Sequence, residues 1–236
     1  MSRLSGRVVV VTGASRGIGL AIAQRLAREG ATLVLVARGR KALERAAASI
    51  PGRGLGVRAD VTKPGDVRRL VGTVRRRFKR IDVLVNNAGT FTFKPFTRTT
   101  LTDWRRNIDA NLTSVFLTTR GALPLLKHSR APQVVNILSI SGRQAFRNCS
   151  AYTASKFGAL GLTRVLVEEL RDHKIRVTAI LPGATNTRLA DEFGFPVRRS
   201  DLIQPEDVAE VLLSALLQPP RSAVEEIVLM PSKGSL

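Results

Sequence analysis

The stretch that decides the fold lies near the N-terminus and reads Val8-Val9-Val10-Val11-Thr12-Gly13-Ala14-Ser15-Arg16-Gly17-Ile18-Gly19. Four consecutive β-branched residues predict a strand that is buried on both faces, as the strands of parallel sheets are. Apolar residues then recur with helical spacing over Leu20–Glu29, and Gly30 stands where helices commonly end. The stretch therefore predicts a strand, a glycine-rich turn and a helix in succession.

The turn has the spacing Gly-x-x-x-Gly-x-Gly, a variant of the dinucleotide-binding fingerprint. Glycines let the backbone turn tightly and approach a pyrophosphate, and the N-terminus of the next helix offers free N–H groups to it. The turn residues expected to contact a dinucleotide are Gly13, Ser15, Arg16, Gly17, Ile18 and Gly19.

Strand and helix patterns alternate along the rest of the chain. The expected strands are Ala31–Ala37, Val57–Asp60, Ile81–Asn86, Gln133–Ser139, Ile175–Leu181 and Glu226–Met230. The expected helices are Lys41–Ile50, one capped by Thr62 and running through Phe78, Leu101–Leu126, Ala151–His173 and Pro205–Leu217. This alternation predicts an α/β fold, a doubly wound parallel sheet with helices on both faces and ligands at the carboxyl ends of the strands. No linker divides residues 1–236, so we expect one domain, with the irregular segment 188–204 as a lid over the substrate.

The end of the second strand indicates which dinucleotide binds. An NAD site places Asp or Glu there to accept a hydrogen bond from the ribose 2′-hydroxyl. This chain has Arg38 instead, and it carries no acid between Glu29 and Glu44. Arg38, together with Arg16 of the turn, suits a 2′-phosphate, so the sequence predicts NADP(H).

The single tyrosine, Tyr152, lies four residues before Lys156. On a helix these positions share one face, and a cation beside a phenol lowers the phenol pKa towards neutrality. The pair is therefore a candidate acid–base group. By itself this spacing also fits an ordinary surface helix, and only the surrounding motifs decide between the two interpretations.

The formal net charge is +20, and residues 61–80 hold eight Lys or Arg residues against one acid, Asp66. Such a charge fits an anionic partner, which would be nucleic acid, an acidic carrier protein or a phosphorylated ligand, but it also fits a solvated helix face. The basic residues are spread along the chain and have no aromatic stacking platform, which favours the solvated face and makes nucleic acid an unlikely partner.

The remaining composition narrows the class of protein. The only cysteine, Cys149, cannot form an internal disulfide, and the N-terminus lacks the pattern of a secretory signal, so we expect a cytoplasmic protein. No apolar run is long enough to span a membrane. His128 and His173 are isolated in the sequence, and no metal is expected.

Taken together, the motifs resemble the short-chain dehydrogenase/reductase family in its compact one-domain form. The motifs are Thr12-Gly-x-x-x-Gly-Ile-Gly19, Asn86-Asn87-Ala88-Gly89, Asn111, Ser139, Tyr152-x-x-x-Lys156 and Pro182-Gly183. The resemblance implies a Rossmann-like seven-stranded sheet with strand order 3-2-1-4-5-6-7.

The resemblance also implies roles for individual residues. Tyr152 would give its proton to the carbonyl oxygen, Ser139 would hold that oxygen, and Lys156 would lower the Tyr152 pKa and bind the nicotinamide ribose. Asn111 would position a water molecule in a proton relay behind Lys156. The further cofactor-binding residues would be Asp60 and Val61 at the adenine, Asn87, Ala88 and Gly89 at the adenosine ribose, and Pro182, Gly183, Thr185 and Thr187 near the carboxamide.

The leading functional hypothesis is an NADPH-dependent reductase of a small-molecule ketone or aldehyde, which can run in reverse as an alcohol dehydrogenase. The alternatives are a 3-oxoacyl-carrier-protein reductase and a non-catalytic dinucleotide-sensing or nucleic-acid-binding protein. The substrate is expected to meet Ser139, Arg143, Phe146, Tyr152 and Phe193. Residues 227–234 lack the Asp-Gly-Gly ending of many family members and resemble a subgroup acting on small polar carbonyls. This places a homotetramer in doubt and leaves a homodimer through 101–126 and 151–173.

Overall fold

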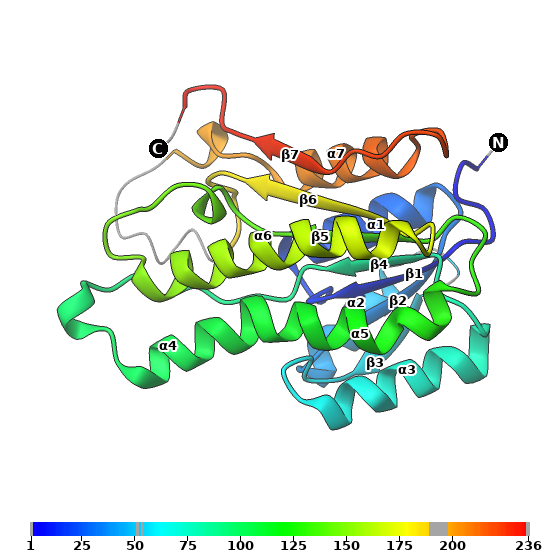
Figure 1. The fold of residues 1–236 in the computed structure, drawn as a ribbon. Helices are drawn as coiled ribbons and strands as arrows, with labels where there is room; N and C mark the ends of the chain where they lie inside the picture. The colour runs from blue at the N-terminus through cyan, green and yellow to red at the C-terminus, as the bar shows by residue number, and fades with distance from the viewer. Residues whose placement is uncertain (1, 51, 53, 189–197, 235–236) are drawn as a thin grey trace.

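The computed structural model describes residues 2–50, 52, 54–188 and 198–234. Its strands form one parallel seven-stranded sheet in the order β3-β2-β1-β4-β5-β6-β7 (Figure 1). The strands are β1 (Val8–Thr12), β2 (Thr32–Ala37), β3 (Gly54–Arg58), β4 (Val83–Asn86), β5 (Gln133–Ile137), β6 (Arg176–Pro182) and β7 (Glu226–Leu229). This order confirms the predicted fold. It also places the switch point of the sheet between β1 and β4, which pair with each other although the chain first runs from β1 to β2.

Helices cover both faces of the sheet. They are α1 (Gly17–Arg28), α2 (Arg40–Ala48), α3 (Pro64–Phe78), α4 (Leu101–Ile108), α5 (Ser114–Leu126), α6 (Ser150–Arg171) and α7 (Pro205–Leu216). One core layer packs α1, α2 and α7 against the sheet, and the other packs α3, α5 and α6. Successive residues of β1 alternate between them, since Val9 and Val11 enter the first layer while Val8 and Val10 enter the second. This two-sided burial explains the uninterrupted valine run.

The helix expected over residues 101–126 runs from Leu101 to Leu126 as predicted, and it contains a π-helical turn, η2 (Asp109–Thr113), between α4 and α5. The predicted cap of the preceding helix, α3, was wrong. The N-cap of α3 is Lys63 rather than Thr62, because Pro64 occupies the first helical position, where its missing N–H costs nothing. The Thr62 hydroxyl instead donates to the carboxylate of Asp60 at 2.8 Å.

The predicted lid lies mostly outside the described residues, which resume at Arg198. After it comes a short 3-10 turn, η5 (Arg199–Asp201), and Ile203 then forms a parallel bridge with Thr185 at the end of β6. Of the helices that the structure describes, none combines the length and the apolar character that crossing a membrane requires.

Candidate active site

The glycine turn is shaped by close backbone contacts. Gly13 has a φ of +66°, and a Cβ atom there would lie 2.9 Å from the Cα of Ala88. A Cβ atom on Gly19 would lie 2.5 Å from the carbonyl oxygen of Gly13. Real Cβ atoms do not approach other atoms this closely, so both positions require glycine. The sequence prediction that these glycines permit a tight turn agrees with this geometry.

Thr12 and Asn87 tie the glycine turn to the segment after β4. The Thr12 hydroxyl accepts hydrogen bonds from the backbone N–H groups of Asn87 and Ala88, both at 3.0 Å. The Asn87 amide donates in return to the carbonyl oxygens of Thr12 at 2.9 Å and Gly13 at 3.2 Å. The turn is therefore held by short neutral hydrogen bonds, and the family resemblance did not anticipate the role of Thr12.

The N-terminus of α1 is suited to an anion. Its N-cap residue, Arg16, makes no side-chain capping hydrogen bond, and the first turn of the helix has no acidic residue. The first N–H groups of a helix have no partner within the helix, and they carry its positive dipole end. The methyl carbon of Thr187 lies 3.5 Å from where a Cβ atom on Gly17 would stand. These features fit the pyrophosphate of a dinucleotide lying against the turn.

The ends of β2 and β3 present two arginines side by side. Arg38 follows β2 directly and is exposed, and Arg58 ends β3 opposite Ala37. The Arg58 Nε donates to the Arg38 carbonyl oxygen at 3.1 Å. Farther along, Asp60 accepts hydrogen bonds from Thr62, and Val61 is buried in the core.

Tyr152 lies in the first turn of α6, half-buried against Phe91. The two rings meet edge to face, with centroids 4.8 Å apart. The side chain of Ser139, which directly precedes the turn η3 (Ile140–Gly142), hydrogen-bonds Tyr152 and also accepts from the backbone N–H of Ser141 at 3.1 Å. Burial raises the pKa of Tyr152 to about 12, although the bond from Ser139 acts in the opposite direction.

Lys156 lies one helical turn beyond Tyr152 and is buried. Its Nζ donates to the carbonyl oxygen of Ile137 at 3.4 Å and lies 5.6 Å from the centroid of the Tyr152 ring. Burial lowers the pKa of Lys156 to about 8. In this structure burial is the largest cause of the raised Tyr152 pKa, and the expectation that Lys156 lowers this pKa stays a prediction.

Asn111 projects from the π-helical turn and makes three hydrogen bonds. Its amide nitrogen donates to the carbonyl oxygen of Thr90 at 3.0 Å and to the hydroxyl of Ser155 at 2.9 Å, while its oxygen accepts from the Thr90 N–H at 2.9 Å. The Ser155 hydroxyl donates to the carbonyl oxygen of Tyr152 at 2.6 Å. Asn111 thus links the loop after β4 to the helix of Tyr152, and a Cβ atom on Gly89 would lie 2.7 Å from its oxygen.

A buried polar ladder, which the sequence analysis missed, crosses the sheet beneath the site. Asn86 of β4 donates to the side chains of Asn136 on β5 at 2.9 Å and Thr119 on α5 at 3.0 Å. Asn136 donates in turn to the hydroxyl of Thr163 on α6 at 2.9 Å. The signal was present, since an asparagine inside an apolar strand must find buried partners.

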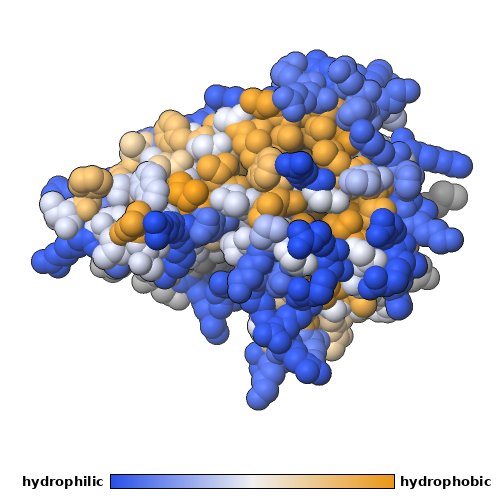
Figure 2. Space-filling model, turned by 60° about the horizontal axis from the view of Figure 1, so that its bottom comes forward, coloured by the Kyte–Doolittle hydropathy of each residue, from blue (hydrophilic) through white to orange (hydrophobic). Residues whose placement is uncertain are grey.

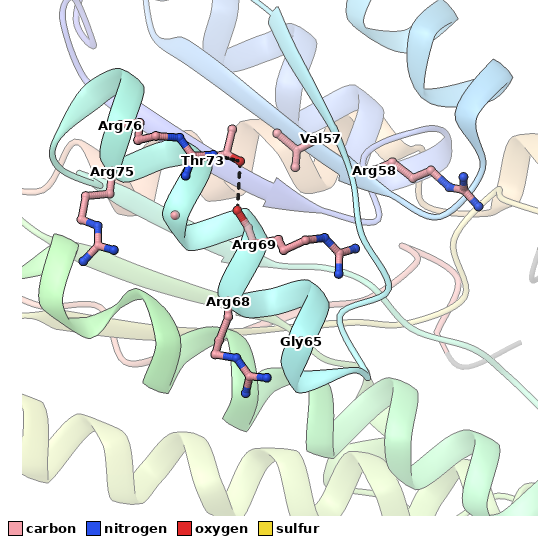
Figure 3. A pocket seen from close by; sticks show the side chains of 9 residues that line it. Val57, Arg58, Gly65, Arg68, Arg69, Thr73, Arg75 and Arg76 are labelled. Carbon is pink, nitrogen blue, oxygen red and sulfur yellow. Dashed lines mark hydrogen bonds between the residues drawn. The ribbon is translucent and has the colours of Figure 1, made fainter.

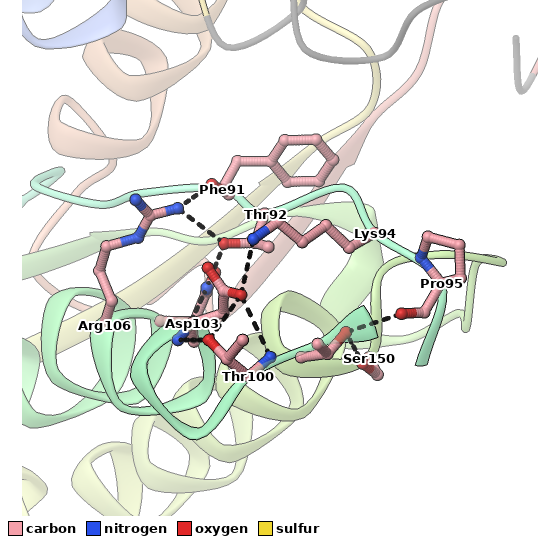
Figure 4. Close-up of polar contacts among 10 residues, drawn as sticks. Phe91, Thr92, Lys94, Pro95, Thr100, Asp103, Arg106 and Ser150 are labelled. Carbon is pink, nitrogen blue, oxygen red and sulfur yellow. Dashed lines mark hydrogen bonds and ion pairs between the residues drawn. The ribbon is translucent and has the colours of Figure 1, made fainter. Parts of the chain in front are cut away.

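The loop after β4 is held against α4 (Figure 4). The Lys94 ammonium pairs with the carboxylate of Asp103 at 2.8 Å, and that carboxylate also accepts from Thr100 in a capping box. Arg106 donates to the hydroxyl of Thr92 at 2.9 Å. Hydrogen bonds from Lys94, the larger cause, and from Thr100 lower the pKa of the Asp103 carboxyl to about 2.

Only some of the predicted substrate residues lie together in the structure. Ser139 and Tyr152 lie together, whereas Arg143 forms an ion pair with Glu226 of β7, so its guanidinium already has a carboxylate partner. Phe146 is half-buried in the turn before α6, and Phe193 falls outside the described residues. Gly183 donates to the Leu229 carbonyl oxygen at 2.7 Å, which fixes the end of β6.

Thr185, a predicted cofactor contact, also lies at the end of β6. The hydroxyl of Thr185 donates to the Gly183 carbonyl oxygen at 3.0 Å, and the hydrogen bonds of the bridge to Ile203 use the N–H of Asn186 and the carbonyl oxygen of Ala184. The backbone of Thr185 itself is therefore not used by that bridge. Within residues 2–188 and 198–234, as far as they are described, no group of three or more His, Cys, Asp or Glu side chains is arranged to hold a metal ion.

Comparison with known proteins identifies the family. The model of the short chain dehydrogenases matches residues 7–194. An uncharacterized oxidoreductase of Staphylococcus saprophyticus is 34% identical over 235 residues, which are 98% of this chain and 100% of the relative. The crystal structure of a metagenomic short-chain oxidoreductase in complex with NADP has 33% identity and a TM-score of 0.86, covering 98% of this chain and 99% of that chain. An alcohol dehydrogenase from the archaeon Thermococcus sibiricus, complexed with 5-hydroxy-NADP, has 30% identity and a TM-score of 0.88, covering 96% and 97%. This chain belongs to the short-chain dehydrogenase/reductase family of oxidoreductases.

Proposed function

We propose that this oxidoreductase is an NADPH-dependent carbonyl reductase, reversible as an alcohol dehydrogenase, with Tyr152 as its proton donor. The observation that carries the proposal is that Ser139, Tyr152 and the buried Lys156 lie together at the carboxyl ends of the strands, beside the glycine turn: Ser139 interacts with Tyr152, and the Lys156 Nζ lies 5.6 Å from the Tyr152 ring centroid. Two hydroxyl groups side by side can hold one carbonyl oxygen between them, and one of them has a buried lysine on the same helix face.

The residues divide the chemistry as follows. A bound nicotinamide dinucleotide supplies the hydride to the carbonyl carbon, or takes it back in the reverse direction. Ser139 holds the substrate oxygen, and the Tyr152 hydroxyl, protonated at neutral pH because burial raises its pKa to about 12, gives its proton to that oxygen. Lys156, whose pKa is lowered to about 8, still carries charge at neutral pH and stabilises the phenolate that remains. Asn111 and Ser155 hold the helix of Tyr152 in position, and Asn111 is the proposed anchor of a proton relay.

NADP(H) is the proposed cofactor because of the charges at the adenosine end. Arg38 and Arg16 are both exposed, one after β2 and one in the glycine turn. A planar guanidinium binds a phosphate through two parallel hydrogen bonds, and no carboxylate follows β2 to bind an unmodified ribose. The NADP and 5-hydroxy-NADP complexes of the two related structures support the same choice.

Tyr152→Phe tests the proton donor. This variant keeps the ring against Phe91 but removes the hydroxyl, so turnover of ketones and aldehydes should fall by about a thousandfold or more while NADPH affinity stays within about twofold. Stopped-assay turnover and fluorescence titration of NADPH measure the two quantities. Turnover that survives in Tyr152→Phe would contradict the assignment.

Arg38→Asp tests the cofactor. Removal of the guanidinium and addition of a carboxylate should weaken NADPH by about a hundredfold or more and leave NADH little changed. Arg130→Asp is the matched control. Arg130 is an exposed arginine just before β5, at the amino ends of the strands and away from the carboxyl ends where the candidate site lies. Equal weakening of both cofactors by Arg38→Asp would refute a 2′-phosphate contact.

We also propose a homodimer through the helices α4, α5 and α6. They carry five exposed large apolar side chains, Leu101, Trp104, Phe116, Phe157 and Val165. Figure 2 shows apolar side chains gathered on this face, with hydrophilic side chains around them. Exposed apolar patches of this kind favour association. Phe116→Asp should yield a monomer in sedimentation equilibrium, and an unchanged mass would contradict the proposal.

A further inference from the structure

A groove that shares only Arg58 with the candidate active site lies along α3, beside the edge strand β3. Its volume is about 750 Å³. Its lining consists of Val57, Arg58, Gly65, Arg68, Arg69, Gly72, Thr73, Arg75 and Arg76. Figure 3 shows Arg58 extending from β3 and the other four arginine side chains extending from α3 in different directions. The volume falls within the range of small-ligand sites, and five of the nine lining residues are arginines, whose charged ends stand on apolar stems.

The sequence of α3 explains how the groove forms. Gly65 with Arg68 and Arg69 is followed seven residues later by Gly72 with Arg75 and Arg76. Seven residues make about two helical turns, so the two arginine pairs lie about 10.5 Å apart on one side of the helix. A Cβ atom on Gly65 or Gly72 would meet only the ends of Arg68 at 3.9 Å or Arg76 at 3.5 Å. The glycines therefore leave the space between the pairs open.

Little in the groove neutralises these charges. Arg69 pairs with Asp66 at 2.9 Å, and Arg76 donates to the hydroxyl of Thr73 at 3.3 Å. Within the described part of the chain, Arg68 and Arg75 form no ion pair. Five guanidinium groups around one hollow repel one another, and an anion that bridges them would relieve that repulsion.

We propose that this groove binds a linear polyphosphate, a small ligand with phosphate groups at both ends that reach the two arginine pairs. Every cation in the lining is an arginine, whose planar fork binds phosphate through two hydrogen bonds, whereas a lysine offers a point charge. Single-stranded nucleic acid is disfavoured because the one aromatic residue of α3, Phe78, packs against the core instead of forming a stacking platform. The proposal does not depend on the proposed reductase activity.

Calorimetric titration of the full chain with sodium tripolyphosphate tests the proposal, at about 150 mM salt, where distant surface charges are screened. We expect saturable binding that Arg68→Gln with Arg75→Gln weakens by about tenfold or more. Gly72→Leu keeps every charge, favours the helix and fills the groove, so it should weaken binding similarly. The control pair, Arg28→Gln with Arg221→Gln, removes the same charge from exposed positions outside the groove and should change affinity by less than about twofold.

Three results would overturn the proposal. They are the absence of saturable binding by the unaltered chain, equal weakening in the groove pair and the control pair, and tighter binding of a glutamate-rich peptide or a single-stranded oligonucleotide than of tripolyphosphate at the same salt. The thermal unfolding midpoints of all variants identify any that fail to fold, and Gly72→Leu keeps the test decisive if the double arginine variant is lost.

Discussion

The glycine turn at residues 12–19 and the loop at residues 90–99 both follow strands at the carboxyl edge of the sheet, yet they are held in different ways. Neutral hydrogen bonds and close backbone contacts fix the turn, through Thr12, Asn87 and the glycines. The loop is fastened partly by an ion pair between Lys94 and Asp103, of which the lysine side chain is 45% exposed. Buried neutral contacts tolerate almost no substitution, whereas exposed charges contribute little to stability. The dinucleotide side should therefore be rigid and the substrate side open to change.

Gly19→Ala should have the largest effect, because its Cβ would lie 2.5 Å from the Gly13 carbonyl oxygen. The turn must shift, and we expect a loss of dinucleotide affinity of about a hundredfold and a destabilisation of roughly 3 kcal/mol. Fluorescence titration and urea unfolding measure both. The control, Gly72→Ala, adds a Cβ at an open helical position and should stabilise by about 0.5–1 kcal/mol. Normal NADPH binding by Gly19→Ala would contradict the view that the glycine turn is more rigid than the loop at residues 90–99.

Asn111→Ala tests the connection between the two sides. It removes three hydrogen bonds and leaves the backbone groups of Thr90 without their partner, so we expect a destabilisation of roughly 2–3 kcal/mol in urea unfolding. The loss should be accompanied by lower turnover, because the helix of Tyr152 loses its link through Ser155. A variant as stable as the unaltered protein would show that the Asn111 hydrogen bonds do not contribute to stability.

Lys156→Met should abolish turnover and yet stabilise the protein measured without cofactor, on the order of 2 kcal/mol, because it removes a buried charge. Burial lowers the pKa of Lys156 from 10.5 to about 8. The folded state therefore binds fewer protons than the unfolded state between these values. The cost of the charge is complete below pH 8 and disappears as the pH rises towards 10.5. A stability difference that stays constant over this range would contradict the assignment.

Lys94→Gln should have the smallest effect on unfolding and a larger one on the KM of the substrate, since the ion pair fastens the loop rather than the core. The pKa of Asp103 is lowered from 3.8 to about 2, chiefly by Lys94. The stabilisation is therefore complete above 3.8 and is lost as the pH falls towards 2. Thermal unfolding of the two proteins should converge over that interval. A difference that grows on acidification would refute the role of the pair.

The fold was predictable because each strand and helix carries its own local pattern. The valine run of β1 and the glycine turn indicated a parallel sheet, and the motif order gave its topology. The positions that were not predicted depend on partners that are distant in the sequence or on two neighbouring residues that could both cap the same helix. Arg143 finds Glu226 eighty-three positions away, and Thr62 loses the capping position to the residue before Pro64.

The site was predictable in its residue types and less so in its electrostatics. Tyr152 and Lys156 share a helix face, as their spacing indicated, but the pKa of a phenol depends on its burial and on where the lysine nitrogen lies. Neither quantity can be read from a spacing of four. The ladder from Asn86 to Asn136 could have been found, because polar residues inside apolar strands are evident in the sequence.

The π-helical turn at Asp109–Thr113 makes the length of the helix between Leu101 and Leu126 important for the orientation of α5. Each residue of a regular α-helix rotates it by about 100°, and a π-helical turn absorbs one additional residue while the flanking helices keep their phase. Forcing this turn into regular α-helix at the same length would rotate α5 and take Thr119 away from Asn86. Deleting Ala110 would instead preserve that contact and remove the position from which Asn111 reaches Thr90. Deleting this one residue should therefore disrupt the position of Asn111 in the site while leaving the packing of α5 on the sheet intact, which a substitution does not do.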